Sequence, residues 1–535
     1  LLFHGGRVAL RRRPKRGLLA GLWEYPNEVD AGPAALEDWG ITPCSLEAGG
    51  AGKHIFSHIE WHMHALLAET ADDALPGGWV WADARELEEV YAIPNAFQAF
   101  SGAVAARLPL TSHRKGAAMN VTALTAAQRR YFNEGLTRSI SFRREMLLRL
   151  KRGLEQHEEA LLSALEQDLG KSRFEAYETE LGIVRAELRD AWKHLEKWAR
   201  PRRAPTPLSQ FPAVSRVYRE PFGVALILSP WNYPLQLTLV PLISALAAGC
   251  TAVVKPSAYA PATSQAVADL LGEVFEERYV ACVQGGRAEN AALLEEHFDF
   301  IFFTGSTEVG RTVMVAAARH LTPVALELGG KSPAILAPDA DLDLAARRIA
   351  WGKFLNAGQT CVAPDHVWVP AEARDFFVEK LKTCITRFYG ERPLESPDLP
   401  RIVNDKHFER LLGLMKSGTA ACGGTWDAPS RRIEPTVLVD VTEDMPVMGE
   451  EIFGPILPVL PYEDLDELVL HLQSKPRPLA LYLFTRNHYR MDRVSALLPF
   501  GGGCVNDTVV HLANGNLPFG GVGESGMGRC HGEWG

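Results

Sequence analysis

The chain has 535 residues, which exceeds the size of one compact core and predicts two to four domains. Its 47% apolar and 23% charged residues are typical of an ordinary soluble globular protein, and a net charge of −9 disfavours general affinity for nucleic acid. Eight scattered cysteines predict neither a disulfide framework nor a zinc site and favour a reducing, cytoplasmic setting.

Residues 1–108 read as a separate α+β block of short strand-like runs, namely GGRVALRRRP, GLLAGLWEYP, HIFSHIEWHMHALLAE and GGWVWAD. Six basic residues crowd into 7–16, a local exception to the acidic balance. Residues 109–118 are polar and have the composition of a linker. Because the chain begins at Leu1 without a methionine, we expect the true N-terminus and any targeting segment to lie outside it.

Residues 123–200 have Leu, Ala, Glu and Arg at helical spacing, and this pattern ends at Pro201. Apolar strands then alternate with helices from residue 217. The predicted strands are VYREPFGVALILS, TAVVKPS, YVACVQG and FDFIFFTG, and the predicted helices are Pro234–Ala248, Ala262–Glu277 and Ser306–Arg319. This alternation predicts a parallel sheet that is covered on both faces. A second α/β region follows over about 338–500, and glycine-rich loops close the chain.

The stretch from Phe222 to Val254 lacks charged residues and is long enough to cross a bilayer. However, the SPWNYP segment breaks it early, and Pro241 and Gly249 break it again. A buried strand, a loop, a helix and a second strand therefore explain it better than a membrane span.

Cys361 lies on a loop, FLNAGQTCVAPD, between a Gly-Gln-Thr turn and an Ala-Pro break. A free cysteine is more often a small buried apolar residue than a reactive one. Four neighbouring motifs bear on this choice. FTGSTEVG runs from a strand into a helix, whose free N–H groups suit an anion, although a plain strand–helix turn is equally consistent. KPS places Lys255 at the carboxyl end of a strand. Open parallel sheets bind nucleotides at this end, although a solvated lysine at a strand exit is equally common.

The other two motifs carry carboxylates. LELGGK places Glu327 within an apolar strand, where an unpaired acid is costly, so a functional role is favoured. EEIFGP offers an acid and an aromatic on a constrained turn; a surface acid pair beside a core phenylalanine is the structural alternative.

Seven motifs in order, SPWNYP, KPS, FTGSTEVG, LELGGKSP, GQTC, EEIFGP and LPFGGVGESGMG, resemble the NAD(P)-dependent aldehyde dehydrogenases over residues of about 120 to 535. The short helical start and VNDTVVH resemble the class 3-like branch. The resemblance implies the α/β fold of that family: N-terminal helices and a Rossmann-like cofactor domain at 119–337, and a catalytic domain at 338–500. Residues 501–535 would return to the cofactor domain and an oligomerisation region that is cut short. A homodimer is also implied.

The resemblance also implies roles for individual residues. Cys361 would be the nucleophile that attacks an aldehyde, Glu327 the base that activates water, and Asn232 a donor to the oxyanion. The implied binding residues for NAD or NADP are Trp231, Lys255, Gly305, Ser306, Thr307, Glu308, Val309, Gly310, Glu451 and Phe453. Ala258 replaces a frequent glutamate after KPS, which leaves the choice between NAD and NADP open and tilts it toward dual use. The substrate aldehyde is not specified; Trp231, Tyr233 and Phe354 favour a medium-chain aliphatic or an aromatic one.

In residues 1–108, GLLAGLWEYP and KHIFSHIEWHM resemble the C-terminal Nudix-like module of adenine DNA glycosylases. AALEDWG replaces the acid cluster of Nudix hydrolases, so this module is expected to be non-catalytic. A nucleic-acid contact is expected only through residues 1–108, where a basic hairpin edge in solvent is the equal alternative. The sequence does not separate a gene fusion, read-through of neighbouring genes and an assembly artefact.

Two other functions compete with aldehyde oxidation. The first is a fold relative that reduces an acyl phosphate, which the intact Glu327 disfavours because that reaction needs no water-activating base. The second is a DNA-repair accessory module fused to an inert dehydrogenase-like part.

Overall fold

The structure is a computed structural model that describes residues 1–13, 22–29, 33–55, 60–83, 86–87, 91, 93–100, 103–104, 107–108 and 120–534. The chain divides into two compact units, Leu1–Ala118 and Met119–Gly535. The predicted linker at 109–118 lies outside the described residues.

The first unit is built on one mixed sheet in the order β3-β2-β1-β5-β4, with β6 paired to β2. Its elements are β1 (Leu2–His4), β2 (Arg7–Arg12), β3 (Trp23–Glu24), α1 (Ala34–Asp38), β4 (Pro43–Ile55), β5 (Glu60–Thr70), β6 (Trp79–Ala82) and a 3-10 turn, η1 (Asn95–Phe100). The HIFSHIEWHMHALLAE run supplies the end of β4 and nearly all of β5, while residues 17–21 of GLLAGLWEYP lie outside the described residues.

Part of the basic run in this unit points inward. Glu24 is buried and accepts from Arg11 Nε at 2.9 Å and from Arg13 Nη1 at 2.5 Å. These ion pairs join β2 to β3, so at least two of the six basic residues are engaged within the sheet.

The second unit opens with the helices predicted over 123–200. They are α4 (Val121–Asn133), α5 (Ile140–Gln156), α6 (Glu158–Leu169), α7 (Arg173–Ala176), a π-helical turn called η3 (Tyr177–Leu181) and α8 (Gly182–Ala199). Side chains of Asn120, Ser139 and Ser172 accept the backbone N–H groups that start α4, α5 and α7. Capping of this kind fixes where each helix begins.

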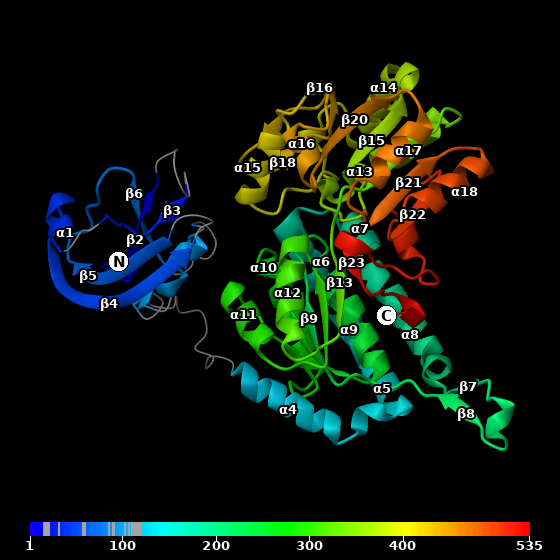
Figure 1. Cartoon of the computed structure of the whole chain (residues 1–535), viewed down its shortest axis with the longest axis horizontal. Coiled ribbons are helices and arrows are strands. Elements are labelled where there is room, and N and C mark those ends of the chain that lie inside the picture. Colours follow the sequence, from blue (N-terminus) through cyan, green and yellow to red (C-terminus); the bar gives the residue numbers. More distant parts are fainter. Residues whose placement is uncertain are drawn as a thin grey trace. The chain divides into compact units, whose positions relative to one another are not determined.

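The predicted parallel sheet is present, in the order β11-β10-β9-β12-β13-β23. Figure 1 labels β9, β13 and β23 of this sheet. All pairs are parallel except the last, in which β23 runs antiparallel to β13. Its strands are β9 (Val224–Leu228), β10 (Thr251–Lys255), β11 (Val280–Cys282), β12 (Phe300–Thr304), β13 (Val324–Glu327) and β23 (Gly526–Met527). The carboxyl ends of β10, β12 and β13 carry Lys255, Thr304 and Glu327 at one edge of the sheet.

Both faces of this sheet are covered, as predicted. Successive residues of a strand enter opposite cores: Leu226 and Val253 pack with α4, α11 (Arg287–Glu295) and α12 (Thr307–Ala318), whereas Ile227 and Val254 pack with α9 (Gln236–Ala248) and α10 (Pro261–Val274). The two-residue alternation of a strand makes each apolar run serve two cores at once.

The prediction that VYREPFGVALILS forms one strand is wrong. Val217 ends β8 (Ser215–Val217), which pairs with β7 (Arg202–Ala204) in a separate hairpin, and β9 begins only at Val224. Pro221 has no backbone N–H to donate to a ladder, and Gly223 has φ +140°, so the chain turns between the two strands.

The second large sheet of this unit has the order β16-β19-β20-β15-β14-β21-β22. Its strands are β14 (Pro333–Leu336), β15 (His366–Pro370), β16 (Thr419–Cys422), β19 (Thr436–Val439), β20 (Ile456–Tyr462), β21 (Ala480–Phe484) and β22 (Gly502–Val505); β17 (Trp426–Asp427) and β18 (Arg432–Ile433) form a small hairpin. The helices of this region are α13 (Leu342–Phe354), α14 (Arg374–Tyr389), α15 (Asp405–Leu414), α16 (Pro446–Gly449), α17 (Leu465–Gln473) and α18 (His488–Leu497).

The chain crosses between the sheets twice. It passes from β13 to β14 within 328–332, a few residues before the predicted boundary at 337/338. It leaves the second sheet after Val505 and pairs again with β13 at Gly526, rather than departing at residue 500. Both crossings lie beside Glu327. This residue is therefore at the place where the chain passes from one sheet to the other.

Among the described residues, no helix has the length and apolarity needed to cross a bilayer. The charge-free stretch folds instead into β9, α9 and β10, with the SPWNYP turn between β9 and α9.

Gly249 offers a test of this packing. It ends α9 at φ +93°, and a Cβ there would lie 2.6 Å from the guanidinium of buried Arg143. We expect Gly249→Ala to lower the free energy of unfolding by about 1–3 kcal/mol, because the left-handed backbone and the close contact both oppose a side chain. Urea denaturation followed by circular dichroism measures this change.

Gly272, inside α10, is the matched control because a Cβ there meets no atom within 4 Å. Gly272→Ala should be neutral or stabilising by up to about 1 kcal/mol, since glycine weakens a helix interior. Equal losses in the two variants would contradict the packing described for Gly249.

Candidate active site

The loop before Cys361 has an unusual backbone. Asn356, Ala357 and Gly358 are consecutive left-handed residues, with φ of 53°, 51° and 73°. A Cβ on Gly358 would collide with the carbonyl oxygen of Gly454, so only glycine fits where the GQTC loop meets the EEIFGP turn. Non-glycine residues adopt this conformation only where their surroundings enforce it, which makes the loop a fixed rather than an adaptable segment.

Hydrogen bonds hold the loop on both sides of Cys361. The buried Gln359 amide donates to the carbonyls of Asn356 and Arg401 and accepts from Val403 N, all at 3.1 Å. On the other side, Tyr482 Oη donates to the Val362 carbonyl at 2.5 Å. The sulfur atom therefore projects from a backbone that is anchored before and after it.

Asn232, predicted as an oxyanion donor, lies against the same loop. Its side chain is 3% exposed, and Nδ2 donates to the Gln359 carbonyl at 3.1 Å. Asn356 Nδ2 donates in turn to the Asn232 carbonyl at 2.8 Å. The SPWNYP turn of the first sheet is thus bonded to the loop that follows α13.

Cys361 and Glu327 line one cavity of about 230 Å³. Most of the other lining side chains are apolar, among them Val240, Phe302 and Trp351. The remaining lining residues include Thr304, Cys530 and His531. The structure therefore brings the predicted nucleophile and the predicted base, which are 34 positions apart in the sequence, to a shared apolar space.

Glu327 is nearly unsolvated at the end of β13. It is 4% exposed, and neither carboxylate oxygen has a hydrogen-bond partner among the described residues. Burial raises the pKa of Glu327 well above its ordinary value, because the charged form loses water without gaining a partner. A carboxylate in this setting is a stronger base than one on the surface.

Burial also raises the pKa of the Cys361 thiol, to about 12, and the nearby carboxylates of Glu451 and Glu327 add to the rise. The thiol form therefore dominates at neutral pH in this arrangement. A nucleophilic Cys361 needs a base to take its proton. Because the pKa of Glu327 is also raised, the difference in pKa between the thiol and this carboxyl group is smaller than it would be for a carboxylate on the surface.

The EEIFGP turn closes another side of the site. Burial raises the pKa of Glu451 to about 8, with Asp365 adding to the rise. A Cβ on Gly329 would collide with the Glu451 carboxylate, which explains the first glycine of LELGGK. Phe453, at φ +50°, meets the Trp231 ring edge-on at 5.4 Å. Three predicted motifs therefore touch one another here.

The sequence motifs did not indicate a role for Asp365 or Lys331. Asp365 Oδ2 lies 2.5 Å from Lys331 Nζ, and Oδ1 accepts from Ile452 N at 2.9 Å. Although burial acts in the opposite direction, Lys331 and His366 hold the pKa of Asp365 far below its ordinary range. The four-residue gap between Cys361 and Asp365 was the available signal, but nothing in it indicated the contact with the EEIFGP turn.

The predicted cofactor segment forms the start of α12. Ser306 caps the helix by accepting Val309 N at 3.4 Å, and Thr307 Oγ1 donates to the Glu524 carbonyl at 3.2 Å. A Cβ on Gly305 would lie 2.5 Å from the Phe303 ring, and one on Gly310 would lie 2.7 Å from Leu328. Glu308 and Val309 are exposed at this end. Gly305 N donates to the Glu327 carbonyl at 3.0 Å, which places the segment directly beside the site.

Lys255 stands apart from this group. It is 3% exposed, and Nζ donates to the Pro256 carbonyl at 2.8 Å. Burial lowers the pKa of Lys255, with Glu289 opposing. Its strand, β10, is separated from β12 by β9, so the structure places Lys255 on the same sheet edge without joining it to α12.

Two of the three aromatic residues expected near the substrate lie elsewhere. Phe354 is fully buried in the core around α13, and Trp231 packs on Phe453 and His407. Tyr233 does line the cavity. The expectation for Phe354 was based on its closeness to Cys361 in sequence. It is wrong because Phe354 lies on the face of α13 that packs into the core.

Comparison with known proteins gives two family matches. Residues 103–535 match the model of the aldehyde dehydrogenase family, and residues 1–101 match the model of the NUDIX domain.

Individual relatives agree with the first match. The 4,4'-diaponeurosporen-aldehyde dehydrogenase of Staphylococcus aureus is 46% identical over 406 residues, covering 76% of this chain and 88% of that protein. The dimeric, NADP-preferring aldehyde dehydrogenase of Rattus norvegicus is 44% identical over 405 residues, covering 76% and 89%. The substrate-bound structure of Staphylococcus aureus AldH has 45% identity and a TM-score of 0.76, covering 77% of this chain and 90% of that one.

These matches confirm the resemblance and the fold expected from the ordered motifs. The chain belongs to the aldehyde dehydrogenase family, whose members oxidise an aldehyde to its carboxylic acid with NAD(P)⁺.

Proposed function

We propose that Cys361, Glu327 and Asn232 carry out this oxidation as nucleophile, base and oxyanion donor. The observation that carries the proposal is the shared cavity: Cys361 and Glu327 both line it, and Asn232 is hydrogen-bonded to the residue two positions before Cys361. A cysteine and a carboxylate in one water-poor space suit covalent catalysis better than packing does.

The first step is addition of the Cys361 thiolate to the aldehyde carbon, with Glu327 receiving the thiol proton. The oxygen that becomes negative needs donors already in place. The Asn232 amide has two N–H groups, of which one is used on Gln359, so the second can serve the oxyanion, together with Cys361 N–H. Bound NAD(P)⁺ would supply the hydride acceptor for this carbon, and loss of hydride would leave a thioester on Cys361.

Hydrolysis then frees the acid. Glu327 must first release the thiol proton to solvent. It then takes a proton from water, the resulting hydroxide adds to the thioester carbon, the carbon–sulfur bond breaks, and the departing thiolate takes the proton from Glu327 to restore the thiol. The need for this step favours Glu327 as a functional rather than a structural acid. It also supports aldehyde oxidation over reduction of an acyl phosphate, which uses no such base.

The residues present fit NAD or NADP. The exposed start of α12 offers backbone N–H groups to a pyrophosphate, and Gly305 lets the backbone pack against the Phe303 ring. Lys255 would hold the adenosine ribose, and Glu451 with Phe453 the nicotinamide ribose and ring. Ala258 supports acceptance of both cofactors, because an acid at that position would repel a 2′-phosphate.

An apolar aldehyde is the substrate class that the cavity supports. Its lining is dominated by aliphatic and aromatic side chains, and Tyr233 and Trp351 are suited to flat or extended hydrocarbon.

A homodimer is the assembly that we propose. The β7–β8 hairpin exposes Leu208, Phe211 and Tyr218 to 88%, 81% and 61%, more apolar surface than a small solvated hairpin tolerates well. A second copy of the chain would bury these side chains, in keeping with the rat relative, which is named as dimeric. The eight cysteines are free thiols, which supports a reducing, cytoplasmic location.

Residues 1–108 are proposed to be a non-catalytic accessory. The ion pairs of Arg11 and Arg13 with Glu24 support the structural reading of the basic run over a phosphate contact, since two of its guanidinium groups already have a carboxylate.

Cys361→Ser should abolish aldehyde-dependent reduction of NAD(P)⁺ while leaving cofactor affinity unchanged, because a hydroxyl ionises far less readily than a thiol. Nicotinamide absorbance measures turnover, and titration of NADPH fluorescence measures affinity. Cys384→Ser, in α14 and away from the cavity lining, should keep parental turnover. Turnover by the Cys361 variant within a few-fold of the parent would refute the assignment.

Glu327→Gln should slow hydrolysis of the thioester more than hydride transfer, because the amide keeps the shape but cannot accept a proton from water. Stopped-flow absorbance should then show a burst of reduced nicotinamide that the parent lacks or shows weakly. Mass spectrometry should detect the acylated Cys361 peptide. Absence of both signals would place Glu327 before hydride transfer or in a structural role.

A chain that begins at Met119 should retain aldehyde oxidation, with its KM for NAD(P)⁺ unchanged within error. The reason is that both sheets and every proposed catalytic group belong to the second compact unit. Steady-state kinetics on the full and shortened chains make the comparison. Loss of activity or solubility in the shortened chain would show that the first unit supports the enzyme.

A further inference from the structure

Lys171 and Glu180 form an ion pair that no step above uses. Lys171 Nζ lies 2.5 Å from Glu180 Oε1, and both side chains are completely buried. Replacing a buried ion pair with apolar residues of similar volume is often neutral or stabilising, so stability alone does not account for this pair. Neither residue is among those that line the cavity.

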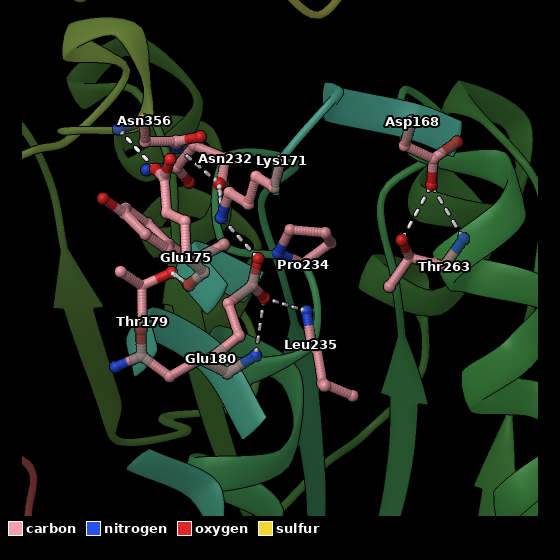
Figure 2. A network of polar contacts seen from close by, with 12 residues as sticks. Asp168, Lys171, Glu175, Thr179, Glu180, Asn232, Pro234, Leu235, Thr263 and Asn356 are labelled. Atoms are coloured by element: carbon pink, nitrogen blue, oxygen red, sulfur yellow. Dashed lines mark hydrogen bonds and ion pairs between the residues drawn. The ribbon is translucent and has the colours of Figure 1, made fainter. Parts of the chain in front are cut away.

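Glu180 fixes the segment that follows Asn232. Its second oxygen accepts from Leu235 N at 2.8 Å and from Gln236 N at 3.2 Å, at the start of α9 (Figure 2). The carboxylate reaches these groups from η3, and π-helical turns occur disproportionately at functional sites. The turn that carries Asn232 is thereby tied at its exit.

Lys171 holds the same turn from the side. Figure 2 shows its ammonium group between Glu180 and the Asn232 carbonyl, to which Nζ donates at 3.4 Å. The ammonium also lies 4.1 Å from the centre of the Tyr233 ring. Tyr233 Oη is 2.6 Å from Thr360 Oγ1, and Thr360 precedes Cys361. One buried cation therefore contacts Asn232 directly and the nucleophile loop through one side chain.

Glu175 completes the frame from the same chain segment. Its Oε1 accepts Asn356 N at 2.7 Å, and Asn356 Nδ2 donates to the carbonyls of Asn232 and Gln359. Burial raises the pKa of Glu175 to about 7, with Lys171 opposing the rise.

We propose that Lys171 and Glu180 are positioning residues for the reaction: their ion pair holds the Asn232 amide and the Cys361 loop in the relative geometry that oxyanion formation requires. This inference rests on the proposed function, in which Asn232 serves the oxyanion. Oxyanion donors act only when they lie about 3 Å from the developing charge, and a displacement of about 1 Å costs on the order of 100-fold in rate.

The test compares Lys171→Met, Glu180→Gln and the double variant Lys171→Met/Glu180→Gln. Each single variant leaves a buried group without its partner and should lower both the melting temperature and kcat. The double variant removes both charges of the pair, and buried Glu175, whose pKa Lys171 no longer lowers, can take up a proton. The amide oxygen introduced by Glu180→Gln can still accept from Leu235 N, so the melting temperature of the double variant should return close to that of the parent. Its kcat should stay ten- to 100-fold below the parent, because the contacts with Asn232 and Tyr233 are still missing.

The loss should fall on kcat and not on the KM for aldehyde or the affinity for NADPH, since the oxyanion exists only beyond the ground state. Stopped-flow measurement of the hydride-transfer rate should show the same deficit.

Asp168→Asn is the matched control. Asp168 is also a buried carboxylate that starts a helix, accepting from Thr263 N and Thr263 Oγ1 at 2.7 Å and from Ala262 N at 3.1 Å at the start of α10. Figure 2 shows this cap apart from the network around Asn232. Its loss should lower the melting temperature with kcat within about twofold of the parent.

Recovery of kcat together with melting temperature in the double variant would overturn the proposal, as would a loss of kcat no greater than that of Asp168→Asn. Either result leaves the proposed function intact if the parent is active and Cys361→Ser is not. Turnover by the Cys361 variant, or a parent without turnover, would end the proposed function and the positioning roles with it.

Discussion

The hydrogen bond from the Asn232 side chain to the Gln359 carbonyl is the contact on which the site depends. Asn232 belongs to the turn that leaves β9 in the first sheet, whereas Gln359 belongs to the loop that follows α13 beside the second. Neither sheet holds a complete site by itself. Because Asn232 is buried, a separation would leave its side-chain N–H without this acceptor, whereas the Gln359 carbonyl would keep its hydrogen bond from Asn356 Nδ2. The cost of the lost bond therefore helps to keep the two halves in one register.

Titratable groups are sorted by depth around this contact. Among those that line the cavity, Cys361 and Glu327 have a pKa that burial raises, and Glu327 has no hydrogen-bond partner among the described residues. Those behind it are paired: Asp365 with Lys331, and Glu180 with Lys171. Apolar walls thus raise the pKa of Glu327 and fit the apolar aldehyde proposed as substrate, while the two ion pairs supply rigidity without themselves lining the cavity.

Much of this architecture was predictable from the sequence, because it is written in short segments. Apolar runs such as TAVVKPS and FDFIFFTG identify buried parallel strands, and the ordered motifs single out Cys361, Glu327 and Asn232 as the candidate catalytic residues. The supporting frame was not predictable. Lys171 and Glu180 occupy ordinary positions in a charged helical region, and the contact of Glu180 with Leu235 spans 55 residues. Likewise, only the packing of α13 shows that Phe354 enters the core, and only Pro221 with Gly223 hinted that β9 starts late.

The π-helical turn at Tyr177–Leu181 makes the frame sensitive to chain length as well as to side-chain identity. Such a turn accommodates one residue more than an α-helical turn does, and each residue advances a helix by about 100°. Removing a single residue between Lys171 and Glu180 would let the segment relax into a regular α-helix and swing the Glu180 carboxylate away from α9. Substitutions that preserve the spacing should therefore disturb the site less than an insertion or a deletion, even at positions whose side chains touch nothing in the site.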